Sequence, residues 1–179
     1  MTLSEIPITT LLKALAVAGA FVAMITDMRR GMIYNWLTFP LLILGLAGNA
    51  FAGGWQGFLH ALAAAGLGIA FYLGFALVGA IGMGDVKLLG AIGALGGVKF
   101  VVSVFLYTSV LGIPHALVVQ YLNHGRQAWG MLLTGVVSRA FLEKTIHTDN
   151  KENRYHYYLG LDILLGTILA VFVEIPLGF

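Results

Sequence analysis

The sequence predicts an all-α fold, a polytopic membrane helix bundle of about six transmembrane helices with a cytoplasmic amphipathic insert. The chain has 179 residues, is 59% hydrophobic and only 10% charged, whereas soluble domains carry about 25% charged residues. Its apolar residues arrive in runs close to the roughly 20 residues that cross a bilayer as a helix. The 24 glycines are typical of membrane helices, in which small residues permit close packing.

Six apolar segments separate along the chain, and one domain covering residues 1–179 accommodates them all. The expected spans are residues 8–26, 36–51, 58–81, 85–97, 100–122 and 158–177. The fourth span is short, so it either sits in the protein interior or continues into the next segment. In the third span Gly66, Ala70 and Gly74 recur every four residues, which predicts a ridge of small residues for helix packing.

Residues 123–157 form the only substantial polar insert. Its centre is apolar every three or four residues, a period that indicates an amphipathic helix lying on the membrane surface. Eight of the ten basic residues, including Arg29, Arg30 and Lys87 and those of the insert, fall on one side of the six spans. The Lys/Arg bias makes this side cytoplasmic, with both termini facing outward.

Composition also excludes several classes of function. The net charge is only +2, so no general nucleic-acid surface is expected. Cysteine is absent, which removes disulfides, thiolate catalysis and cysteine-based metal sites. The partner that composition does imply is the lipid bilayer.

Asp27 and Asp85 are the candidate catalytic residues. Acidic residues in membrane segments are expensive and point to function by default. Asp27 closes the first span and Asp85 opens the fourth, which places both at the same cytoplasmic level. Two carboxylates that share a site keep one proton between them. The ionised one can take a proton from water while the protonated one polarises a peptide carbonyl, without metal or cofactor.

Asp85 stands in an unusual local sequence, Gly82-Met83-Gly84-Asp85-Val86-Lys87-Leu88-Leu89. Gly82 and Gly84 permit positive φ and close approach of another backbone, as an extended substrate requires. Asp85 taken alone is equally compatible with a helix N-cap.

This stretch resembles the GxGD motif of the type IV prepilin peptidase and preflagellin peptidase family. Asp27, followed by Ile33-Tyr34-Asn35-Trp36-Leu37-Thr38, is similar to that family's aspartate followed by Ile-Pro-Asn-x-Leu-Thr. Tyr34 stands in place of the usual proline. The resemblance covers residues 21–97, with two motifs in the family's order and spacing.

The resemblance implies an aspartyl endopeptidase of the prokaryotic inner (cytoplasmic) membrane with its active site facing the cytoplasm. Such enzymes remove the short basic leader of prepilins or pseudopilins. Larger bacterial members carry an N-terminal cytoplasmic domain with paired cysteines and also methylate the new N-terminus. This chain begins with a span and has no cysteine, so it resembles the short peptidase-only forms that serve Flp/Tad-type pili, and N-methyltransferase activity is not expected.

The remaining polar residues near the spans have two interpretations each. Asn35 either bonds near the aspartate pair or begins the second helix, and Lys87 either contacts substrate or Asp85, or anchors the chain at the interface. His60 and His115 are isolated intramembrane histidines, so no zinc site is expected. Asp162 either approaches the active site from the cytoplasmic end of the sixth span or, as is favoured, is an ordinary polar residue at a helix end.

Two other functions use the same residues. A small proton- or cation-coupled transporter would use Asp27 and Asp85 as ion sites, and a noncatalytic scaffold would use Asp85 as a cap. The acids lie at the cytoplasmic margin and no inverted repeat is visible, whereas transporters favour midplane sites between repeats. The peptidase is therefore the leading hypothesis.

Overall fold

The fold is all-α, as the composition predicts. A computed structural model describes residues 8–77, 81–124 and 158–173. These residues form α1 (Ile8–Arg30), α2 (Asn35–Leu77), α3 (Met83–Gly96), α4 (Val98–His124) and α6 (Leu159–Phe172). The expected amphipathic helix falls almost entirely on residues 125–157, outside the described residues.

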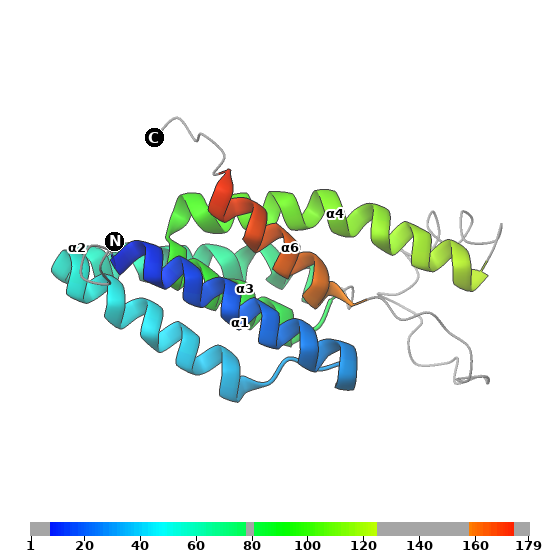
Figure 1. The fold of residues 1–179 in the computed structure, drawn as a ribbon, viewed down its shortest axis with the longest axis horizontal. Coiled ribbons are helices and arrows are strands. Elements are labelled where there is room, and N and C mark those ends of the chain that lie inside the picture. Colours follow the sequence, from blue (N-terminus) through cyan, green and yellow to red (C-terminus); the bar gives the residue numbers. More distant parts are fainter. Residues whose placement is uncertain (1–7, 78–80, 125–157, 174–179) are drawn as a thin grey trace, which may run out of the picture.

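The long helix α2 contains two of the predicted spans, because it breaks and folds back on itself (Figure 1). Gly54 adopts a φ of +60° at the break, a left-handed conformation that glycine reaches without steric cost. Gly45 in the first half lies against Ala94, and Ala64 in the second half lies against Gly93. The two halves of α2 therefore run antiparallel to each other and contact the same part of α3. The break lies between residues 51 and 58, as the predicted spans required.

Helix α3 is the centre of the core. Nine of its residues between Val86 and Leu95 are buried, and the helix contacts α1, α2, α4 and α6. These contacts confirm that this short helix sits in the protein interior. It does not continue into the next helix, because Gly97, at a φ of +85°, separates α3 from α4.

Small residues bring α2 and α3 together, but they are not the ones that the sequence suggested. A Cβ atom on Gly68 would lie 2.6 Å from the carbonyl oxygen of Leu89, so only glycine allows this approach. Around Gly66 and Gly74, by contrast, nothing described lies within 4 Å of a Cβ position. The predicted ridge of Gly66, Ala70 and Gly74 is exposed, and that prediction is wrong.

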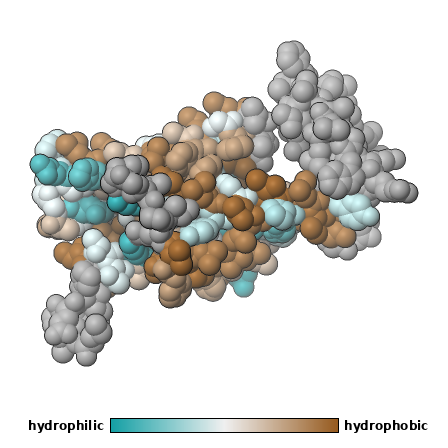
Figure 2. Space-filling view, turned by 90° about the horizontal axis from the view of Figure 1, so that it is seen from above, coloured by the Kyte–Doolittle hydropathy of each residue, from teal (hydrophilic) through white to brown (hydrophobic). Residues whose placement is uncertain are grey.

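Three of the described helices are long and apolar enough to cross a membrane: α1, α2 and residues Val98–Val119 of α4. Helix α6 is apolar but shorter. Hydrophobic residues cover most of the coloured surface in Figure 2, and hydrophilic ones gather toward its left end. Large apolar side chains such as Ile43, Val110 and Phe172 are exposed, as expected for a surface solvated by lipid.

One end of the bundle, opposite the hydrophilic left end of Figure 2, brings together helix termini that carry acidic residues. Helix α1 ends at this end, and α3 and α6 begin there (Figure 1). The start of α1 and the end of α6 lie toward the opposite end (Figure 1). Residues far apart in the chain thus meet where three helix termini converge.

Candidate active site

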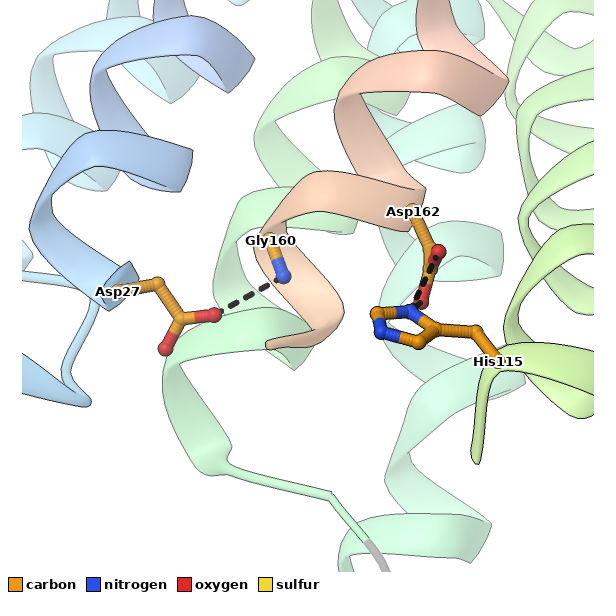
Figure 3. A network of polar contacts seen from close by, with 4 residues as sticks. All are labelled: Asp27, His115, Gly160 and Asp162. Carbon is orange, nitrogen blue, oxygen red and sulfur yellow. Dashed lines mark hydrogen bonds and ion pairs between the residues drawn. The ribbon is translucent and has the colours of Figure 1, made fainter. Parts of the chain in front are cut away.

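Asp27 lies in the last turn of α1, half-buried. Gly31, at a φ of +62°, ends the helix, and its N–H donates to the Asp27 carbonyl oxygen at 2.7 Å, as at many helix C-termini. The side chain of Asp27 points away from this turn toward α6 (Figure 3). Its Oδ2 accepts a hydrogen bond of 3.0 Å from the backbone N–H of Gly160.

Asp85 is the third residue of α3, not its N-cap. Gly82 occupies the N-cap position with a φ of −78°. Gly82 therefore does not adopt the positive φ that the sequence allowed. Asp85 Oδ2 accepts a hydrogen bond of 3.2 Å from the Gly82 N–H, which is one half of a capping box. Its Oδ1 is buried and has no hydrogen-bond partner among the described residues, so this oxygen is left for another ligand.

The two glycines of the motif permit close contacts instead. A Cβ on Gly84 would lie 2.9 Å from the Cβ of Ile33 and 3.1 Å from its carbonyl oxygen. A Cβ on Gly82 would lie 3.1 Å from Asp85 Oδ2. Gly84 therefore lets the turn after Asp27 pack against the start of α3, and Gly82 leaves room for the Asp85 carboxylate.

The sequence stretches after Asp27 and around Asp85 also meet through a side-chain bond. Lys87 Nζ donates to Asn35 Oδ1 at 3.0 Å, and the ammonium lies 5.8 Å from the ring centroid of Phe39. Asn35 begins α2, as one interpretation expected, and Lys87 ties α3 to that helix start. Neither side chain bonds to Asp27 or Asp85 among the described contacts.

Tyr34, which replaces the family's usual proline, has contacts of its own. Its hydroxyl accepts a hydrogen bond of 3.1 Å from Arg30 Nη1, and its backbone carbonyl accepts from the N–H groups of Leu37 and Thr38 at the start of α2. Tyr34 thus takes part in the turn between α1 and α2 through both its side chain and its backbone.

Asp162 and His115 form a pair that the sequence did not predict. Asp162 in the first turn of α6 is only 3% exposed, and its two oxygens lie 3.1 and 3.0 Å from His115 Nδ1 of α4 (Figure 3). The expectation of an isolated histidine is therefore wrong for His115, whereas Asp162 does lie at a helix end, in the first turn of α6. They lie 47 positions apart, so no sequence motif predicts their contact.

Tyr72 of α2 is a second residue that the sequence did not single out. It is 4% exposed and lies within electrostatic range of both Asp85 and Asp162. Asp85 is likewise within electrostatic range of Asp27. Four helices thus contribute acidic or phenolic groups to one region. In the part of the chain that the structure describes, no group of three His, Cys, Asp or Glu side chains could hold a metal ion.

Comparison with known families assigns the chain. Residues 14–117 match the profile of the type IV leader peptidase family, and this stretch is more than half of the 179 residues. The chain belongs to the type IV leader peptidase family. Comparisons with curated proteins and with solved structures returned no match.

The family assignment agrees with the resemblance seen in the two motifs, and it identifies the chain as a membrane peptidase. The matched stretch contains Asp27, Asp85 and His115, and it ends before Gly160 and Asp162 of α6.

Proposed function

We propose that this peptidase is an aspartyl endopeptidase that cleaves the short basic leader from prepilins or pseudopilins, with Asp27 and Asp85 as the catalytic pair. The observation that carries the proposal is that Asp27, near the end of α1, and Asp85, in the first turn of α3, lie within electrostatic range of each other. Membership of the type IV leader peptidase family supports leader removal as the reaction.

The chemistry follows from two carboxyl groups that share one proton. The ionised carboxylate takes a proton from a water molecule, which attacks the scissile carbonyl carbon. The protonated carboxyl donates its proton to the carbonyl oxygen, so a tetrahedral gem-diol forms. Collapse of this intermediate breaks the C–N bond, and a proton passes to the leaving amine. The unpartnered Asp85 Oδ1 offers a place for the water or the carbonyl.

The setting suits a leader with positive charge. The acids stand at the end of the bundle that we assign to the cytoplasm on the Lys/Arg bias. A basic leader would be attracted to a pair that carries one negative charge, while the apolar helix of the substrate stays in the bilayer. The site would then cut at the membrane margin.

A cleavage assay tests the catalytic pair. The purified protein in liposomes is mixed with a prepilin-type substrate, and the new N-terminus is read by mass spectrometry. Asp27→Asn and Asp85→Asn should each lower cleavage by about 10⁴-fold, as loss of a catalytic carboxylate does elsewhere. Glu5→Gln, which the sequence places ahead of the first span, is the matched carboxylate control and should cleave normally.

Folding is monitored by thermal unfolding, so that lost activity is not mistaken for lost structure. Cleavage by either Asn variant at the wild-type rate would remove that residue from the pair. A proton or cation flux that depends on both acids, without cleavage, would instead support the transporter. Cleavage that persists in excess EDTA is expected, because the mechanism uses no metal.

A further inference from the structure

The first turn of α6 carries two side-by-side contacts to other helices (Figure 3). The Gly160 N–H reaches back to Asp27 on α1, and Asp162, two residues later, is held by His115 on α4. In the figure this turn stands between the two side chains. Any movement of the turn changes both contacts together.

Gly160 is suited to hold a carboxylate because of its place in the helix. Helix α6 begins at Leu159, so the Gly160 N–H is among the first amides, which have no acceptor within the helix. This amide makes the only hydrogen bond to the Asp27 side chain among the described residues. It occupies Oδ2 of Asp27.

Close packing adds a second constraint at the same residue. A Cβ atom on Gly160 would lie 3.0 Å from Asp27 Oδ2, 3.1 Å from Asp27 Cβ and 3.2 Å from Met24 Cα. The backbones of α1 and α6 therefore approach as closely as the absence of a side chain permits. The position of this turn determines the position of the Asp27 carboxylate.

The turn itself is held by a buried carboxylate. Asp162 is 3% exposed, and a carboxylate removed from water requires a partner. Both Asp162 oxygens lie within hydrogen-bonding distance of His115 Nδ1, and this ring nitrogen donates to the carboxylate in the tautomer that carries its proton on Nδ1. His115 comes from α4, directly after Pro114. The pair thus connects the start of α6 to a helix that does not touch Asp27.

We propose that His115 and Asp162 are positioning residues for Asp27. His115 fixes Asp162, Asp162 fixes the first turn of α6, and the Gly160 N–H of that turn orients the Asp27 carboxylate. The proposal rests on the catalytic role proposed for Asp27. In this proposal both residues act on Asp27 through Gly160.

The Gly160 amide reports on this arrangement without any cleavage. In protein labelled with ¹⁵N-glycine and held in detergent micelles, its resonance is assigned as the one missing from Gly160→Ala. Asp27→Ala gives the position of this resonance when the hydrogen bond is lost. His115→Leu should shift the resonance toward that position. His115→Asn, which keeps an N–H donor where Nδ1 stands, should leave it near the wild-type position.

Cleavage kinetics provide the second readout. His115→Leu should lower kcat by about 10- to 100-fold, the usual cost of a misplaced catalytic group, and leave KM unchanged because the substrate contacts remain. His115→Asn should restore most of kcat. His60→Leu is the matched control, because His60 is an exposed residue of α2, and it should change neither quantity.

Loss of His115 alone leaves a buried carboxylate unpaired and can unfold the protein. The double variant His115→Leu/Asp162→Leu removes both polar groups together, which is far better tolerated, and it should show the same shift and the same loss of kcat. A Gly160 resonance that stays at its wild-type position in folded His115→Leu or in the double variant would overturn the proposal. If Asp27→Asn still cleaves, the proposed function fails, while the resonance still reports on the positioning.

Discussion

At the scale of single residues, Gly160 is the position where α6 meets the proposed catalytic pair. Gly160→Ala keeps the N–H donor but places a methyl group 3.0 Å from Asp27 Oδ2. We expect about a tenfold or greater loss of kcat, because the carboxylate must move by a few tenths of an ångström or more. The unfolding temperature should also fall, because the same methyl group would lie 3.2 Å from Met24 Cα. Cleavage kinetics and thermal unfolding check this. Wild-type kcat would show that the contact does not position Asp27.

Asp27 and Asp85 also predict the pH dependence of cleavage. The mechanism requires one carboxyl protonated and the other ionised, so kcat should fall at low pH, when both carry protons, and at high pH, when both are ionised. A bell-shaped profile is expected, and its two limbs belong to the pair and not to either residue. The profile is measured with a substrate whose own charge is constant over the range. A flat profile would contradict a two-carboxylate mechanism.

At the scale of helices, the α2–α3 interface separates glycines that pack from glycines that do not. Gly68 meets the backbone carbonyl of Leu89, whereas Gly66, two residues earlier in the same helix, has nothing described within 4 Å of its Cβ position. Gly68→Ala should destabilise the protein by about 1–3 kcal/mol through overpacking. Gly66→Ala should be neutral or stabilising by up to about 1 kcal/mol through helix propensity.

These two variants form a matched pair, because the same methyl group is added to the same helix on different faces. Unfolding in mixed micelles of SDS compares their stabilities directly. Equal stabilities would show that α2 and α3 do not approach each other at Gly68.

At the scale of the whole molecule, the proposed site lies at one end and the break in α2 lies toward the other (Figure 1). Met32, after α1, is 56% exposed, and Trp55, at the break in α2, is 70% exposed. Because the chain has no cysteine, a single cysteine at either position can be labelled selectively. With the site facing the cytoplasm, a membrane-impermeant maleimide applied to intact spheroplasts should label Trp55→Cys and not Met32→Cys.

Permeabilised cells provide the control, since both cysteines should then react. The reverse pattern in intact spheroplasts would place the aspartates on the outer side. It would also contradict the orientation that the Lys/Arg bias predicts.

Much of this architecture follows from the sequence by itself. Membrane residence follows from composition and from runs of apolar residues, because lipid imposes helices on any spanning backbone. The ends of the helices were predictable to within a few residues, since glycines and charges mark them. Asp27 and Asp85 could be paired because charge bias and span order placed both at one level. The motif after Asp27 and the glycines before Asp85 indicated the family, which the match over residues 14–117 then established.

Only the tertiary structure decided which surfaces face inward and which distant residues meet. The ridge of Gly66, Ala70 and Gly74 was predicted wrongly because a helix that is apolar all round carries no periodic signal of its buried face. The contact between Asp27 and Gly160 joins residues 133 positions apart, and a backbone N–H has no signature in the sequence. His115 and Asp162 looked isolated for the same reason: the bond between them forms only when α4 and α6 pack side by side.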